Sequence, residues 1–268
     1  APLAGRFGGG AELSWPGMDF MTTSGAINIH LKAETTQTVD AIPVTGVVSI
    51  RARGGVFDVE QFLLNTDASQ VKPTGQFSRD GTTDLRFSLT SKNAEQLQTI
   101  AYSIDEVRKS VEAFEPQILG DFRFEGRLQG PLKDPTLEGD LNASNVLLHD
   151  EPLGAVRGHL SLSPIEVKFE NGALVAANGG SAKFTYSAPR NARAAEGRLD
   201  ATVERISGDT VIAAAGLPIG QKFFSGDLSG EAHLTGLPGA PKGTATINLI
   251  NGTIGGQTAV LAAASLVF

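Results

Sequence analysis

The sequence contains no cysteine, so disulfide bonds, thiolate catalysis and cysteine-ligated zinc are all excluded. It has one tryptophan and two tyrosines among 268 residues, fewer than sugar-binding clefts normally use. No stretch of about 18 consecutive apolar residues occurs, so the sequence predicts no membrane-spanning helix. The net charge is −7 and lysine and arginine form no cluster, which argues against binding to nucleic acid or to an anionic bilayer surface.

The two ends of the sequence carry no targeting signal. The chain opens at Ala1 without an initiator methionine or a charged leader, and residues 259–268 are apolar with no polar tail. We therefore expect a segment of a longer protein, whose last strand belongs to a continuing sheet.

What the sequence does contain is alternation of apolar and polar residues with period two. One strand, for example, places Leu199, Ala201 and Val203 on one side and Asp200 and Thr202 on the other. This pattern predicts antiparallel strands with one apolar and one solvated face. We take the apolar positions as candidate lining residues of a groove: Ile27, Ile29, Leu31, Phe122, Phe124, Leu137, Leu141, Val156, Leu160, Leu162, Leu199, Val203, Leu228, Leu234 and Ile247.

Two stretches follow a helical period instead. Residues 93–114 place apolar side chains at helical spacing, with Ser91 or Asn93 as the N-terminal cap and Pro116 after the end. A shorter helix is predicted over residues 208–215, capped by Ser207. We expect the long helix to pack its apolar stripe onto the sheet; a movable plug over the groove is the alternative.

A repeat emerges when the chain is shifted by 106 residues. The shift places Gly120 on Gly226 and Asn145 on Asn251, together with the residues between them, without a gap. Repetition at this scale indicates one unit of strands stacked against its neighbours.

The fold class that follows is mainly β: a curled antiparallel sheet forming a groove, built of repeated strand units, with one long and one short helix. Glycines at strand centres, such as Gly139, Gly158 and Gly230, allow such a sheet to curl. The predicted segments are a β-groove segment at 1–92, a helix at 93–118, a β-groove repeat at 119–206, a short helix with its connection at 207–225, and a truncated β-groove repeat at 226–268.

Residues that could carry chemistry form no constellation. Three histidines, His30, His159 and His233, fall on the polar side of their strands, and His149 stands apart, so no metal site is predicted. The loop at residues 236–244 lacks the order of a phosphate-binding loop, and Ser229 lies within a strand, not at a nucleophile elbow. We predict no catalytic residue, no cofactor and no enzymatic activity, although one sequence does not exclude a carboxylate pair.

Residues around the repeat resemble a known family. Phe124-Glu-Gly-Arg-Leu-Gln-Gly130 followed by Asp134-Pro-Thr-Leu-Glu-Gly-Asp-Leu-Asn-Ala-Ser-Asn145 resembles the Leu-x-Gly…Pro-x-Leu-x-Gly-x-Leu-x-Leu-x-Asn signature of TamB and AsmA-like proteins. Residues 230–252 resemble it again, with Thr244-Ala245 in place of the glycine step. Residues 57–75 and 85–94 are similar to upstream strands of the same proteins, so the resemblance extends over most of residues 40–255.

The resemblance implies a β-groove with an apolar interior, located in the bacterial periplasm and anchored in the inner membrane through a segment absent from this chain. It implies a phospholipid or another long apolar ligand moving between the inner and outer membranes. It brings no catalytic residue with it.

Two other functions remain open from the residues. The same fold could act as a scaffold or chaperone for outer-membrane protein assembly, with exposed strand edges pairing with client strands and an outer-membrane assembly protein as partner. An extracellular β-solenoid or adhesin, for which sugar is one candidate ligand, is the third hypothesis, and the two predicted helices argue against it.

Overall fold

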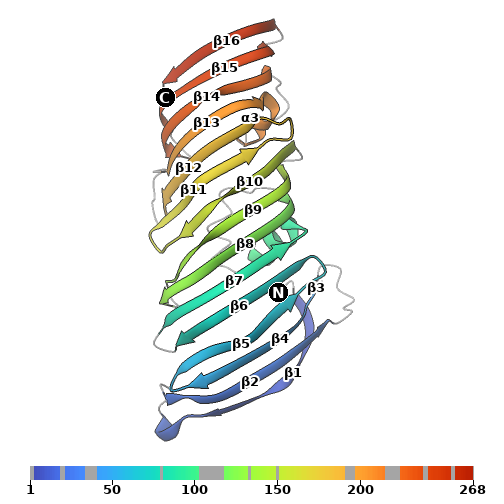
Figure 1. Cartoon of the computed structure of the whole chain (residues 1–268), viewed down its shortest axis with the longest axis vertical. Helices are drawn as coiled ribbons and strands as arrows, with labels where there is room; N and C mark the ends of the chain where they lie inside the picture. The colour runs from blue at the N-terminus through green and yellow to red at the C-terminus, as the bar shows by residue number, and fades with distance from the viewer. Residues whose placement is uncertain are drawn as a thin grey trace. The chain divides into compact units, whose positions relative to one another are not determined.

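The computed structural model describes residues 3–18, 22–33, 41–78, 81–102, 118–131, 134–148, 151–190, 197–214, 224–237, 241–254 and 257–267. Most of these residues are in strands (Figure 1). The strands are β1 (Leu3–Ser14), β2 (Ser24–Ala33), β3 (Ile42–Pro43), β4 (Thr45–Arg53), β5 (Val56–Asn65), β6 (Ser69–Ser78), β7 (Thr82–Ser91), β8 (Ile118–Pro131), β9 (Thr136–Leu148), β10 (Glu151–Leu162), β11 (Glu166–Val175), β12 (Ser181–Pro189), β13 (Gly197–Ser207), β14 (Phe224–Leu237), β15 (Lys242–Ile254) and β16 (Gln257–Val267). The helices are the 3-10 turn η1 (Pro16–Met18), α1 (Ala94–Tyr102) and α3 (Gly208–Ala214).

The described strands form one open sheet. Their order is β16-β15-β14-β13-β12-β11-β10-β9-β8-β7-β6-β5-β4-β2-β1-β3, and the first and last strands are not neighbours. The registers between successive strands are antiparallel, whereas β3 pairs with β1 in parallel. The prediction of a mainly β, antiparallel protein with few helices is therefore confirmed.

The chain divides into two compact units. The first contains Ala1–Glu115 and Asp121–Gly139, and the second contains Pro116–Gly120 and Asp140–Phe268. The division passes through β8 and β9 instead of a linker. It does not test the finer segments read from the sequence, which stay a prediction.

Strand pairing sets which residues share a face in each unit. In the first unit, Val48 on β4 lies opposite Ile29 on β2 and Phe62 on β5. Because directly opposed residues point to the same side of a sheet, the apolar positions of successive strands join into one surface.

Bulges in the second unit shift the phase of this alternation and keep the apolar residues on one side, as two of them show. On β11, Phe169 and Gly172 both face the same side, although they are three residues apart. The inserted residue Asn171 adopts a left-handed φ of 52°. Arg205 does the same on β13 with φ 51°, between the paired positions of Val203 and Ile206. A bulge of this kind leaves one residue unpaired and bends its strand.

Aromatic rings contact glycines on the apolar side. A Cβ placed on Gly139 would lie 2.8 Å from the Phe124 ring, and one on Gly158 would lie 2.5 Å from the Phe169 ring. The rings also pair across strands, with centroids 5.4 Å apart for Phe87 and Phe124 and 5.3 Å for Phe169 and Phe184. The missing Cβ atoms therefore give the rings the space in which they lie.

Both predicted helix starts are confirmed. The Asn93 Oδ1 atom accepts a hydrogen bond from the Gln96 amide at 3.2 Å, which caps α1. The Ser207 Oγ atom accepts one from the Thr210 amide at 3.1 Å, which caps α3. Residues 103–117 and 215–223 lie outside the described residues, and with them the predicted ends of both helices.

The repeat seen in the sequence is also a repeat of backbone conformation. The bounds of β14 and β15 equal those of β8 and β9 shifted by 106 residues. Gly120 and Gly226 have φ of 124° and 111°, and Asn145 and Asn251 have φ of 54° and 50°. Equivalent residues thus meet equivalent conformational demands in both copies.

We predict that Gly139→Ala destabilises the protein by about 1–3 kcal/mol, because the new methyl group meets the Phe124 ring and the Glu125 carbonyl. Urea unfolding followed by circular dichroism measures the change. Gly10→Ala is the matched control, since a Cβ there meets nothing within 4 Å. Equal stability of the two variants would contradict the prediction, because it would show that the Phe124 ring tolerates a Cβ atom at residue 139.

Candidate functional site

The strand registers place the candidate lining residues on one side of their unit, which we name the apolar face. In the first unit these residues are Ile27, Ile29, Leu31, Phe122, Phe124 and Leu137. In the second unit they are Leu141, Val156, Leu160, Leu162, Leu199, Val203, Leu228, Leu234 and Ile247. Their common side is a geometric finding, whereas their contact with a ligand stays a prediction.

The apolar face carries no charge at its paired positions. In the registers of the described strands, every paired Asp, Glu, Lys, Arg and His falls on the opposite side, which we name the polar face. The one-residue phase changes at Asn171 and Arg205 preserve this separation. A ligand on the apolar face therefore meets hydrocarbon and glycine backbone.

Sequence reasoning missed many members of the apolar face. The stacked rings of Phe57 and Phe77, with centroids 5.1 Å apart, belong to it through their mutual register. Tyr186 belongs to it opposite Phe169 and Leu199. The period-two pattern is present around each of these residues, so the same signal could have found them.

In each unit, a described helix lies against the apolar face at the ends of strands. In the second unit, Val211 of α3 packs on the cluster formed by Ala176, Ala182 and Ile206. In the first unit, the Gln96 side chain of α1 accepts a hydrogen bond of 2.8 Å from Ser69 Oγ, at the start of β6. The described part of α1 thus contacts the sheet through Gln96. Packing of its apolar stripe onto the sheet stays a prediction, and movement of the helix a hypothesis.

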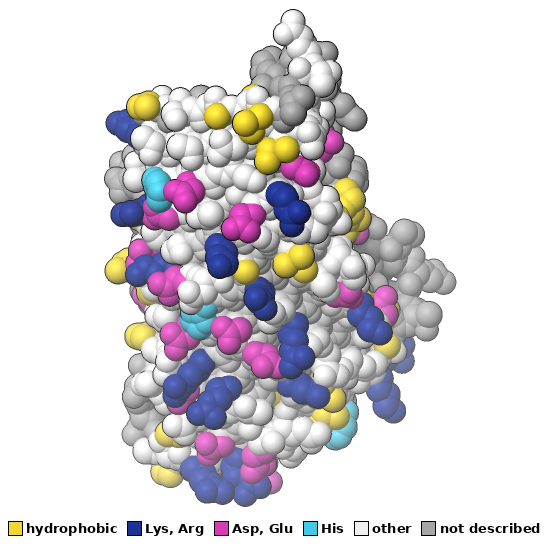
Figure 2. Space-filling view, turned by 45° about the horizontal axis from the view of Figure 1, so that its top comes forward, with side chains coloured by type: hydrophobic (Ala, Val, Ile, Leu, Met, Phe, Trp, Pro, Cys, Tyr) yellow, Lys and Arg dark blue, Asp and Glu magenta, His cyan; other side chains and the backbone are white. Residues whose placement is uncertain are grey.

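The polar face is covered by ion pairs. Figure 2 shows acidic and basic side chains interspersed over the surface that it displays. In the second unit, Asp200 binds Arg198 at 2.9 Å and His233 at 2.8 Å, and these hydrogen bonds hold the pKa of Asp200 below its usual value. His159 lies 2.9 Å from Asp140. The histidines thus lie on the polar side, as the alternation predicted; His149 lies outside the described residues.

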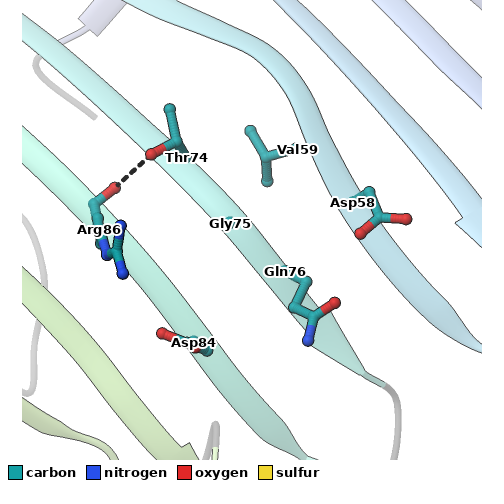
Figure 3. Close-up of a pocket in the computed structure, with 7 residues that line it drawn as sticks. All are labelled: Asp58, Val59, Thr74, Gly75, Gln76, Asp84 and Arg86. Carbon is teal, nitrogen blue, oxygen red and sulfur yellow. Dashed lines mark hydrogen bonds between the residues drawn. The ribbon is translucent and has the colours of Figure 1, made fainter.

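A depression of about 430 Å³ opens on the first unit. It is lined by Asp58, Val59, Thr74, Gly75, Gln76, Asp84 and Arg86 (Figure 3). Thr74 Oγ1 donates a hydrogen bond to the Arg86 carbonyl at 3.5 Å. The Nε and Nη2 atoms of Arg127 donate to the two carboxylate oxygens of Asp84, each at 2.7 Å. Asp84 is therefore already paired with a side chain outside the depression.

Other reactive candidates have structural partners. Ser229 lies within β14 and its Oγ atom accepts the Arg205 amide at 2.9 Å, which satisfies the bulge on β13. Among the described residues, no group of three or more His, Asp or Glu side chains could hold a metal ion. The described helices include none that is long and apolar enough to span a membrane.

Comparison of the chain with protein-family models, with curated proteins and with solved structures gives no match. The likeness to TamB and AsmA-like proteins therefore rests on the residues quoted above.

We predict that Thr83→Val stabilises the first unit by about 1 kcal/mol. Thr83 is 2% exposed and its Oγ1 atom has no hydrogen-bond partner in the described part of the chain. Burying this hydroxyl costs desolvation free energy that no hydrogen bond offsets, and a methyl group in its place removes that cost. Urea midpoints measure the change. Thr202→Val, at an exposed position on β13, is the control and should change stability by less than about 0.5 kcal/mol.

We further predict that Asp84→Asn makes the free energy of unfolding fall less steeply as the pH is lowered than it does in the wild type. The hydrogen bonds from Arg127 hold the pKa of Asp84 below its usual 3.8, so this carboxylate stabilises the fold above that pH. Its contribution is lost as the pH falls through the lowered pKa. Urea midpoints between about pH 5 and pH 2 measure the effect. Asp58→Asn removes the other carboxylate of the depression and should leave the wild-type slope; equal slopes in all three proteins would contradict the prediction.

Proposed function

We propose that the apolar face binds the acyl chains of phospholipids, and that the chain is a segment of an envelope protein that conducts lipid between the inner and outer membranes. The observation that carries the proposal is the separation of charge: all paired charged residues of the described strands lie on the polar face. The periplasmic location, and an anchor in the inner membrane outside this chain, follow the TamB and AsmA-like proteins that it resembles.

The magnitude of the interaction favours transfer over storage. A fully buried methylene contributes about 0.8 kcal/mol. A sheet covers a chain from one side, so about ten half-covered methylenes contribute roughly 4 kcal/mol, equivalent to a dissociation constant of about 1 mM. Weak binding repeated along adjacent strands allows an acyl chain to exchange from one position to the next.

Aromatic rings and glycines adjoin on this face. The rings of Phe124 and Phe169 occupy the space that a Cβ atom on Gly139 or Gly158 would enter. Extended chains can lie along such a surface without meeting deep pockets that would fix one length. The proposal assigns no catalytic residue, metal or cofactor to the chain.

The proposal is tested by photocrosslinking from two adjacent residues of β10. A crosslinking amino acid at Leu160, on the apolar face, should capture phospholipid in a bacterial envelope preparation, whereas one at His159, on the polar face, should not. Leu234 provides a further position on the apolar face and Asn142 one on the polar face. Native mass spectrometry of the purified chain should detect bound lipid. Lipid captured equally from both faces would contradict the proposal.

Capture of polypeptide in place of lipid would favour the scaffold or chaperone alternative. Crosslinks from Leu160 to outer-membrane proteins, with no phospholipid in the native mass spectrum, would be that result.

A further inference from the structure

Tyr186 is the exception on the apolar face of the second unit. Among the paired residues of that face on β10 to β13, it is the only one whose side chain carries a polar atom. Its neighbours across the strands, Phe169 and Leu199, are apolar. A hydroxyl group on this surface is therefore a distinct chemical feature.

The Tyr186 hydroxyl lies at the end of the strands. A Cβ on Gly197 would lie 3.0 Å from the hydroxyl oxygen, and Gly197 is the first residue of β13. The ring thus leans from its own partner Leu199 toward the strand end, into space that a larger residue would fill.

The Tyr186 hydroxyl has no partner in the described part of the chain. Burial raises the pKa of Tyr186 above its usual value, so the group is a neutral donor at physiological pH. The hydroxyl of a partly buried tyrosine usually finds a hydrogen-bond partner. Here a ligand on the apolar face can supply the acceptor.

Arg190 brings positive charge to the same strand end. Its amide donates to the Ile165 carbonyl at 2.8 Å and its Nη1 atom donates to the Ser163 carbonyl at 3.4 Å. The nearby cations Lys168 and Arg198 each bind a carboxylate at 2.9 Å, whereas Arg190 binds none among the described residues. Four residues of extended chain separate Arg190 from Tyr186, about 13 Å, which two long side chains can bridge.

The opposite strand end differs. There α3 packs Val211 against Ile206 and its neighbours, so that end is covered by hydrocarbon. A ligand with a polar head and apolar tails thus meets donor and cation at one end of the strands and a packed helix at the other.

We infer that the Tyr186 hydroxyl binds an ester carbonyl of a diacyl lipid whose tails lie on the apolar face and whose anionic headgroup lies by Arg190. This inference rests on the proposed function and adds an orientation to it. An ester carbonyl is an acceptor without a donor of its own, so it suits a phenolic O–H group.

The test compares an ester lipid with its ether analogue, which lacks the carbonyl oxygens. Dipalmitoyl phosphatidylglycerol and the matching dihexadecyl diether lipid compete with bound diphenylhexatriene, an uncharged fluorescent probe. The wild-type chain should bind the ester about fivefold more tightly, the effect of about one hydrogen bond. Tyr186→Phe should reduce this ratio to about one.

Two further variants sharpen the result. Tyr102→Phe removes the other tyrosine hydroxyl of the chain, on α1 of the first unit, and should keep the fivefold ratio. Arg190→Gln should remove a preference for phosphatidylglycerol over phosphatidylcholine while keeping the ester preference. Circular dichroism and urea midpoints check that each variant is folded.

The outcomes separate the two claims. The inference is wrong if the probe and both lipids bind but the wild type shows no preference for the ester lipid. It is also wrong if Tyr186→Phe keeps the wild-type ratio of ester to diether affinity. Either result leaves the proposed function, lipid binding by the apolar face, in place. If neither probe nor lipid binds the folded chain, the proposed function fails and the inference fails with it.

Discussion

The register between antiparallel strands is the constraint on which the rest of this structure depends. A slip of one residue in any strand would exchange its apolar and polar faces. Phe169 and Gly172 would fall on opposite sides of a regular strand, and the left-handed residue Asn171 between them returns both to one side. The left-handed residue Arg205 likewise places Val203 and Ile206 on one side. The bulges therefore help to keep charged residues off the apolar face.

Cross-strand packing substitutes for a second layer in this sheet. Few side chains of the described residues are fully buried, and much of the apolar face is only half-buried. Phenylalanine pairs and the contacts of rings with bare glycine backbone recover apolar contact within the sheet itself. An arrangement that packs sideways in this manner leaves its face available for a ligand, which a sandwich would bury.

The second unit has a direction as well as a face. Its apolar surface is bounded by the α3 cluster around Ile206 at one strand end, and it carries Tyr186 and Arg190 at the other. A uniform hydrocarbon surface binds acyl chains without orienting them, because dispersion and hydrophobic contacts have no direction. The Tyr186 hydroxyl and the Arg190 guanidinium supply direction through hydrogen bonding and charge.

The sequence by itself determined the strands, both helix starts, the 106-residue repeat and the common side of the candidates from Ile27 to Ile247, because period-two alternation and capping residues act over short distances. Only the tertiary structure decided the strand order, the contacts of Phe124 and Phe169 with glycine, and the continuity of the face across the bulges. It alone brought Tyr186 over Gly197 and Arg190 to Ser163. These contacts depend on cross-strand register, which joins residues distant in the chain and which alternation within one strand does not encode.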